Sequence, residues 1–188
     1  MDMKRLWIFL LLSNLGVAQA WSYSCDTDSK WPPSTPTDRF NDNGDGTLTD
    51  IRLGMTWMRC SLGQTWSDNT CSGEARTYDW KGAHAAAADL NMNGGYGKFN
   101  DWRVPQIPEL AMVIETQCSA PRINATLFPE TPAAFYWSGT PGQRARTGAY
   151  MLSFGSEGAL PGELADLHYV RLVRSDKMPG RPSPPGKK

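Results

Sequence analysis

The stretch Asn100-Asp101-Trp102-Arg103-Val104-Pro105-Gln106-Ile107-Pro108-Glu109-Leu110 sets an acid, a tryptophan and a base side by side between two helical patterns. A glycine-rich break, Gly94-Gly95-Tyr96-Gly97, precedes it, and its two prolines suit a reversal of the chain that leads into a new helix. No nucleophile or metal-ligand pattern converges on this stretch. We therefore predict a structural role, in which Trp102 is largely buried and Asp101 or Arg103 is held by backbone or ion-pair contacts.

Apolar residues at helical spacing lie on both sides of this stretch. Before it, Thr77 is expected to cap a helix from Tyr78 to Leu90. The buried stripe of that helix consists of Trp80, Ala83, Ala87 and Leu90. After it, a second short helix is predicted that ends before Cys118, with Pro108 in its first turn, where the missing N–H has no helical partner. The apolar positions of the second helix are Ile107, Leu110, Val113 and Ile114.

The rest of the chain is typical of short strands joined by turns. Asn-Gly and Asp-Gly dipeptides in Asp42-Asn43-Gly44-Asp45-Gly46 signal a tight β-turn, and a second turn is expected at Arg52-Leu53-Gly54. Two Gly-rich linkers, 141–148 and 155–168, are predicted loops where a binding surface would lie. The predicted strands are Thr47–Asp50, Met55–Arg59, Ala134–Thr140, Ala149–Phe154 and Tyr169–Arg174.

The first twenty residues have the pattern of a secretory signal peptide. Two basic residues precede an apolar run from Leu6 to Leu12, and Ala18-Gln19-Ala20 is a small-x-small cleavage site. We expect export to the periplasm, the cell surface or the medium, and no membrane span, because no segment approaches the length that a bilayer requires. The predicted organisation is a signal peptide over 1–20, an extended Pro/Ser/Thr lead-in over 21–38, one domain over 39–175 and a disordered basic tail over 176–188.

The charge of the chain disfavours nucleic acid as a partner. Of 19 basic and 19 acidic residues, Lys4, Arg5 and Asp2 leave with the signal peptide, so 17 and 18 remain. The tail holds four basic residues and one acid, which leaves the body with a net charge of about −4. Affinity for phosphate depends on clustered basic charge, and the body has the opposite sign.

Four cysteines in an exported chain predict two disulfides, and three pairings are possible. We favour Cys60–Cys71, which closes a polar loop, and Cys25–Cys118, which pins the N-terminal segment to the body. The spacings fit no zinc site, because there is no C-x-x-C and the chain has two histidines. A reactive thiol is the alternative interpretation.

The segment from Asn41 to Arg52 also has part of a calcium-loop pattern. Its Asn and Asp side chains and Gly46 fall at loop positions one, three, five and six, but Arg52 occupies position twelve, where a bidentate Glu is needed. A glycine-rich hairpin is the favoured interpretation. A weak calcium site is the alternative, with carboxylates from Asp42, Asp45 and Asp50, and no other cofactor is expected.

Several motifs occur in a recognisable order: Asp42-Asn43-Gly44-Asp45-Gly46-Thr47, Gly54-Met55-Thr56-Trp57-Met58-Arg59, Asp101-Trp102-Arg103-Val104-Pro105 and Val170-Arg171-Leu172-Val173-Arg174. This series resembles the Lcl C-terminal domain family, which is named after a collagen-like bacterial adhesin. The resemblance implies a secreted or surface α+β domain of the C-type-lectin-like or sulfatase-modifying-factor-like kind, with two helices and short antiparallel strands. It also implies adhesion through sulfated glycosaminoglycans. The chain lacks a Gly-x-y collagen repeat, and its acidic body disfavours sulfate groups.

We therefore expect a non-enzymatic binding or adhesion module for an extracellular glycan or a surface protein. Catalytic residues are not expected. The predicted ligand-binding residues are Arg144, Arg146, Arg171 and Arg174. In an alternative structural role, Arg171 and Arg174 pair with Asp101 or Glu109. The alternative functions are a structural component of a cell-surface or pilus-type assembly and an oxidase related to the formylglycine-generating enzymes.

Overall fold

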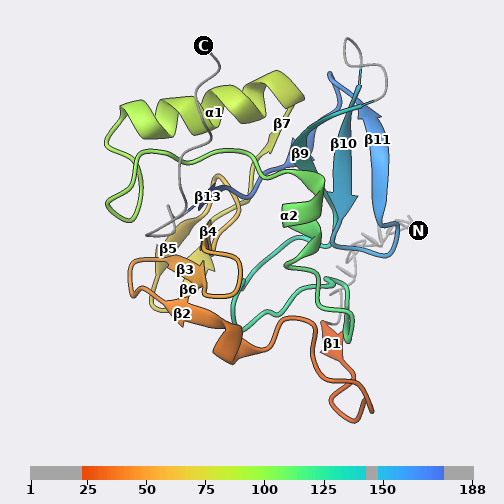
Figure 1. Cartoon of the computed structure of the whole chain (residues 1–188). Helices are drawn as coiled ribbons and strands as arrows, with labels where there is room; N and C mark the ends of the chain where they lie inside the picture. The colour runs from red at the N-terminus through yellow and green to blue at the C-terminus, as the bar shows by residue number, and fades with distance from the viewer. Residues whose placement is uncertain (1–22, 143–147, 176–188) are drawn as a thin grey trace, which may run out of the picture.

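Two β-sheets organise the part of the chain that the computed structural model describes, residues 23–142 and 148–175 (Figure 1). The predicted signal peptide and basic tail lie outside these residues. The larger sheet has the strand order β11-β10-β9-β12-β7, and its neighbours are antiparallel except for the parallel pair β12 and β9. Its strands are β7 (Thr77–Tyr78), β9 (Phe135–Pro141), β10 (Gly148–Ser153), β11 (Ala159–Glu163) and β12 (His168–Tyr169).

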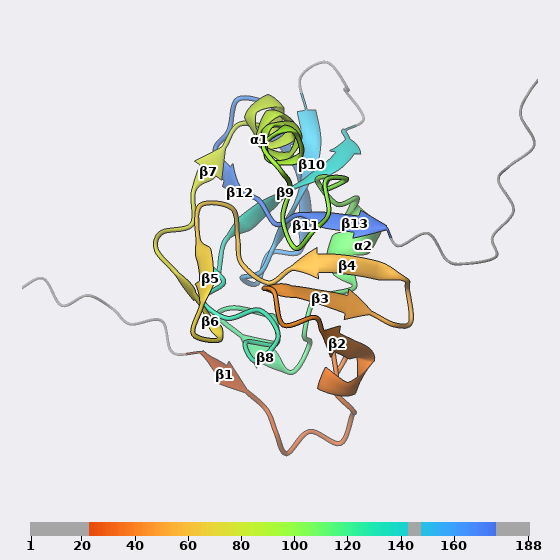
Figure 2. The same cartoon turned by 90° about the vertical axis from the view of Figure 1, so that its left-hand side faces the viewer.

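The second sheet is antiparallel, with the order β13-β4-β3-β2 (Figure 2). The turn between β3 and β4 lies where the sequence predicts it, and Gly54 has a φ of +62°, a conformation that side chains disfavour. All four residues of β4 are buried, so both faces of this strand are covered. The strands are β2 (Phe40–Asp42), β3 (Thr47–Asp50), β4 (Met55–Met58) and β13 (Val173–Ser175).

Two small sheets hold the disulfides. In the first, β1 (Ser24–Cys25) pairs with β8 (Cys118–Ser119), and the two bonded cysteines are direct partners in the register. In the second, β5 (Thr65–Ser67) pairs with β6 (Thr70–Ser72), and Cys71 of β6 is bonded to Cys60. The pairing that we favoured from the sequence is therefore the one in the structure.

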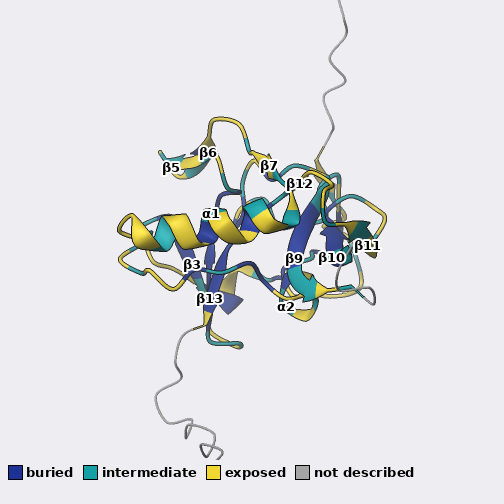
Figure 3. Ribbon diagram, turned by 90° about the horizontal axis from the view of Figure 1, so that it is seen from above, coloured by how far each residue is buried: buried dark blue, intermediate teal, exposed yellow. Residues whose placement is uncertain are grey.

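The first helix, α1, spans Trp80–Met92 and begins two residues later than predicted. Asp79 caps it in place of Thr77, because its carboxylate accepts a hydrogen bond from the Gly82 N–H at 2.6 Å. Thr77 is instead part of β7, which pairs with β12. The buried stripe is confirmed at Ala83 and Ala87, and Figure 3 shows exposed residues along the outer side of α1.

The second helix, α2, is a five-residue segment, Ile107–Ala111, rather than a helix that continues toward Cys118. Gln106 and Glu109 form a capping box at its start. The chain then tightens into turns with hydrogen bonds three residues apart, in which the N–H groups of 112, 113 and 114 donate to the carbonyls of 109, 110 and 111. Ile114 then bridges to Ile123 as extended chain, and this pairing ends the helical geometry.

The predicted fold class was wrong. The expectation was an α+β domain with two helices in a C-type-lectin-like arrangement, whereas the described residues form a β-rich domain with several sheets and one substantial helix, α1. Two misassigned segments account for part of the difference. The predicted loop 155–168 contains β11, and the predicted strand Tyr169–Arg174 is divided between β12 and β13. Tyr169 pairs in the larger sheet and Val173 in the smaller one, so this segment joins the two sheets.

The stretch around Trp102 has the predicted structural role. Trp102 is 2% exposed, and its indole N–H is shared between the carbonyls of Tyr96 at 3.0 Å and Phe99 at 3.1 Å. The side-chain amide of Asn91 in α1 accepts from the Trp102 backbone N–H at 2.9 Å and donates to the Trp102 carbonyl at 2.8 Å. The stretch thus fixes α1 to the glycine-rich break.

Both charged neighbours of Trp102 are held by ion pairs, as predicted. Arg103 donates to both carboxylate oxygens of Glu109 at 2.7 Å, and Arg174 Nε donates to Asp101 Oδ1 at 2.7 Å. The backbone of Arg103 also exchanges two hydrogen bonds with Val173, at 2.9 and 3.0 Å. These bonds cover the outer edge of β13, which would otherwise be open to pairing with another chain.

Candidate functional site

The arginines predicted to bind a ligand do not form one exposed surface among the described residues. Arg144 and Arg146 lie outside them. Arg171 is completely buried, where it donates to the Met58 carbonyl at 3.0 Å and the Thr131 hydroxyl at 2.7 Å. Burial lowers the pKa of Arg171. Its position is therefore in the core and not on a ligand-binding surface.

Arg174 is also largely buried, at 8% exposure, and for this residue the alternative prediction of a pair with Asp101 is confirmed. For Arg171 the alternative was wrong, because its guanidinium group donates to a carbonyl and a hydroxyl instead. Its guanidinium group stacks over the Phe99 ring, 3.8 Å from the ring centroid. Sulfate recognition needs clustered and accessible cationic side chains, and neither Arg171 nor Arg174 supplies one.

The three aspartates of the calcium interpretation serve three different partners. Asp42 accepts from Arg59 at 2.7 Å, and Asp45 accepts from the Thr47 hydroxyl at 2.6 Å. Asp50 is fully buried and pairs with Arg39. In residues 23–142 and 148–175 there is no group of three or more His, Cys, Asp or Glu side chains placed to hold a metal ion.

All four cysteines of the chain lie in disulfides. The Cys60–Cys71 bond closes a short loop with a separation of 11 residues, whereas Cys25–Cys118 joins residues 93 apart. The chain therefore has no free thiol, the group that thiol-dependent oxidase chemistry requires. In the described residues the second bond connects the N-terminal segment to the body.

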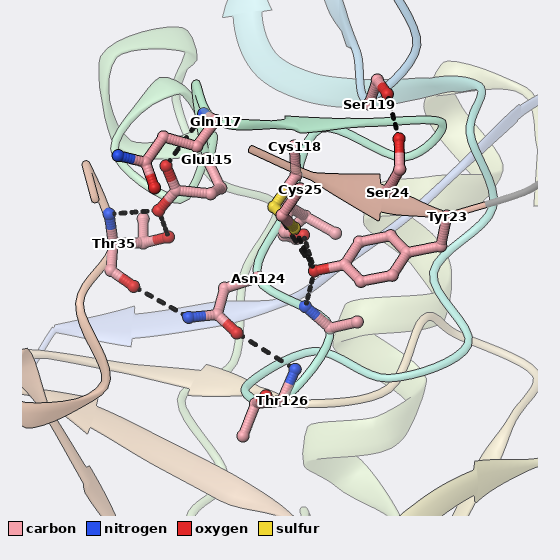
Figure 4. Close-up of a disulfide and its surroundings, with 12 residues drawn as sticks. Tyr23, Ser24, Cys25, Thr35, Glu115, Gln117, Cys118, Ser119, Asn124 and Thr126 are labelled. Atoms are coloured by element: carbon pink, nitrogen blue, oxygen red, sulfur yellow. Dashed lines mark hydrogen bonds between the residues drawn. A yellow bond between two sulfur atoms is a disulfide. The ribbon is translucent and has the colours of Figure 1, made fainter. Parts of the chain in front are cut away.

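A buried carboxylate strengthens that connection (Figure 4). Glu115 is 3% exposed and accepts hydrogen bonds from the backbone N–H groups and the hydroxyls of Ser34 and Thr35, at 2.7 to 3.1 Å. The backbone N–H of Gln117 adds a fifth, at 3.1 Å. Burial alone would raise the pKa of Glu115, but these hydrogen bonds outweigh it and hold the pKa below the ordinary value. The predicted lead-in is therefore pinned to the domain.

We expect Glu115→Gln to lower the free energy of unfolding at pH 7 by about 3 kcal/mol, because an amide NH₂ cannot accept the bonds that a carboxylate oxygen accepts. The Glu115 carboxylate stabilises the fold above its ordinary pKa of 4.5, and this contribution is lost as pH falls through the lowered folded-state pKa. Denaturant unfolding from pH 7 to pH 3 measures both effects. The variant should lose less stability over this range than wild type does, and parallel curves would contradict the assignment.

An open groove lies between the N-terminal segment and the loop from 120 to 134. Its volume is about 610 Å³, within the usual size range of ligand pockets. Tyr23 forms part of one wall and is 41% exposed. Its hydroxyl donates to the Ile123 carbonyl at 3.3 Å and accepts from the Ala125 N–H at 3.1 Å, so the ring is fixed in place. The other lining residues include Pro121, Phe128, Glu130, Thr131, Pro132, Ala133 and Ala134.

The loop from 120 to 134, which forms the other wall of the groove, is held by side-chain hydrogen bonds to its backbone and to the N-terminal segment. Arg59, which follows β4, donates to the carbonyls of Leu127 at 2.9 Å and Thr126 at 2.7 Å. Asn124 donates to the Thr35 carbonyl at 2.9 Å and accepts from the Thr126 N–H at 3.0 Å (Figure 4). Both walls are thus fixed by specific bonds, and a ligand would enter a preformed site.

A smaller hollow of about 160 Å³ continues the groove, because both are lined by Ala133 and Ala134. Glu157 and His168 lie along it. Burial lowers the pKa of His168, so its imidazole is neutral at pH 7. Among the residues that line the groove and the hollow, Glu130 and Glu157 are the charged side chains, and both are acidic.

These features define a β-rich, disulfide-linked domain with a preformed open groove. The chain belongs to the Lcl C-terminal domain family, whose profile matches residues 46–174. A comparison with curated proteins gave no match. Within the described residues there is no helix long and apolar enough to cross a membrane. Family membership points to a surface-associated or adhesin-type domain, and the two disulfides fit an extracellular or periplasmic location.

None of the lining residues of the groove was predicted as a site residue. The groove joins Tyr23 to residues about a hundred positions later, so no local pattern reports it. The one available signal was the Cys25–Cys118 pairing, because a bond between the N-terminal segment and the body must create a seam where the two meet.

Proposed function

We propose that this protein is an exported binding module of the adhesin type, which takes a segment of a surface protein into the groove between Tyr23 and the loop from 120 to 134. The supporting observation is the groove itself, a preformed site of about 610 Å³ with fixed walls. Its lining of proline, alanine and aromatic side chains suits apolar side chains of a polypeptide. Glu130 in the groove and Glu157 in the adjoining hollow favour a segment that also carries Lys or Arg, and they disfavour a sulfated glycan.

The groove can be blocked without touching the core. Ala133 lines it and is exposed, so an indole at this position would fill the groove and leave the buried residues in place. Ala85 of α1 is exposed too and is not among the residues that line the groove, so Ala85→Trp is a matched control. Both variants should unfold within about 0.5 kcal/mol of wild type.

A random-peptide display library tests the proposal on the mature, oxidised protein. We expect wild type and Ala85→Trp to enrich the same peptides, with apolar and basic residues, and Ala133→Trp to bind them at least tenfold more weakly. Enrichment of the same peptides by Ala133→Trp, or enrichment of none by wild type, would show that the groove is not a polypeptide-binding site.

A further inference from the structure

Trp31 is the most exposed of the large apolar side chains in the described residues, at 80%. It lies in the loop between β1 and the short 3₁₀ helix at Thr37–Arg39. This loop projects from the body at the bottom of Figure 1. A tryptophan is ordinarily among the side chains that contribute most when buried, so an indole left in solvent requires an explanation.

The backbone that carries this indole is firmly held. The Trp31 N–H donates to the Ser29 hydroxyl at 3.2 Å, and the Trp31 carbonyl accepts from the side-chain amide of Gln117. The Asp26 N–H donates to the Gln117 carbonyl at 2.8 Å. The disulfide at Cys25 and the Glu115 clamp hold the two ends of the loop. The ring is therefore presented from a fixed position, which lowers the entropy cost of binding.

The surroundings of Trp31 are rich in groups that exchange hydrogen bonds. An open hollow of about 500 Å³ lies next to it, and its polar lining consists of the Thr27 and Ser29 hydroxyls, the Lys30 ammonium group and the Gln117 amide. Two prolines, Pro32 and Pro33, complete the lining. The combination of one aromatic ring with the neutral hydroxyl and amide groups of Thr27, Ser29 and Gln117 matches a sugar ring, which has an apolar face of C–H groups and a rim of hydroxyls.

The charge of the loop selects among glycans. Lys30 is the charged residue that lines the hollow, but Asp26 and Asp28 lie in the same loop and bring its net charge to −1, so the loop has no excess of positive charge for sulfate or uronate groups. A neutral glycan is therefore the class of glycan that suits this loop. Trp31 also lies outside the part of the chain that matches the family, residues 46–174, so the family match does not cover this loop.

We propose that the Trp31 loop is a second binding site, in which the indole stacks against a pyranose ring of a neutral, unsulfated glycan and the polar groups of the adjoining hollow bind its hydroxyls. This inference extends the proposed binding role to a second ligand, but it does not depend on the groove. The two sites are separable by mutation, because neither Tyr23 nor Ala133 lines the hollow beside Trp31.

Affinity electrophoresis in native gels tests the site with defined probes: hydroxyethyl cellulose, xylan, galactomannan and glycol chitin as neutral polysaccharides, and heparin as the sulfated one. The oxidised wild-type protein should be retarded by at least one neutral polysaccharide. Trp31→Ala should weaken that affinity at least tenfold, and Trp31→Phe should retain part of it, because a smaller ring still stacks. Ala133→Trp, which blocks the groove, should be retarded like wild type.

Four results would overturn the inference: no retardation by any neutral polysaccharide, retardation by heparin alone, equal retardation of wild type and Trp31→Ala, or a Trp31→Ala defect confined to peptide binding. The last result would assign Trp31 to a protein interface. Because the side chain is exposed, Trp31→Ala should keep the melting temperature of wild type, so a lost affinity reports the site and not unfolding. A failure of Ala133→Trp to block peptide binding would leave the glycan site unaffected.

Discussion

Replacing Trp102 by alanine is expected to lower the free energy of unfolding by about 4 kcal/mol, as large-to-small substitutions of buried aromatic residues do. The side chain is 2% exposed and packs in the cluster that includes Ala83, Ala87 and Trp137. The truncation would leave a cavity and would also free the carbonyls of Tyr96 and Phe99, which share the indole N–H. Urea denaturation of the oxidised protein measures the loss.

The chain provides a matched control for this substitution. Trp31→Ala removes the same side chain from an 80% exposed position and should change the free energy of unfolding by no more than about 0.5 kcal/mol. If Trp102→Ala kept wild-type stability and lost only ligand binding, Trp102 would belong to a binding site and the structural assignment would be wrong.

Replacing Asp50 by alanine should cost about 4 kcal/mol, because it would leave the Arg39 guanidinium group buried without its counter-charge. Asp50 is completely buried and Arg39 is 5% exposed. Asp50 accepts from Arg39 Nε at 3.0 Å and from the backbone N–H groups of Arg52 at 3.0 Å and Leu53 at 3.2 Å. It therefore neutralises a buried cation and also fixes the turn between β3 and β4.

A double variant separates these two roles. In Arg39→Met with Asp50→Leu, no buried charge is left unpaired, and we expect recovery of about half of the loss, since apolar replacements of buried ion pairs are often tolerated. Asp38→Ala, at an exposed position one residue before Arg39, is the control and should be close to neutral. A double variant as unstable as Asp50→Ala would show that the turn contacts, and not the unpaired charge, dominate the cost.

Local chemistry made several features predictable. The Arg52-Leu53-Gly54 turn and the strands on both sides follow from turn residues and from β-forming residues, and neither depends on distant chain. Trp102 was predicted to be buried because no nucleophile or metal-ligand pattern converges on its stretch, whose prolines and glycines suit a chain reversal between two helices. The disulfides were predicted from the polar loop between Cys60 and Cys71 and from the expectation that the chain is exported.

Other features depended on competition between residues far apart. Thr77 and Asp79 can both cap a helix, and Asp79 caps α1 because Thr77 pairs with Tyr169 in the larger sheet. The alternation from Tyr169 to Arg174 is that of one strand, but its two halves find partners in different sheets. The predicted fold class was wrong for this reason, because short strands pair with partners that no local periodicity identifies.

The sequence by itself determined the local turns, the cysteine pairs that could form, the family and the burial of Trp102, because each depends on residue types and short spacings. The tertiary structure alone decided that Arg171 lies in the core, that Glu115 clamps the N-terminal segment, and that Tyr23 lines a groove with the loop from 120 to 134. The physical reason is that a charged or aromatic side chain has the same local signature whether it faces solvent or a distant partner. For the stretch around Trp102, the partners in the fold are Asn91, Glu109 and Arg174, and they make it a structural support and not a binding site.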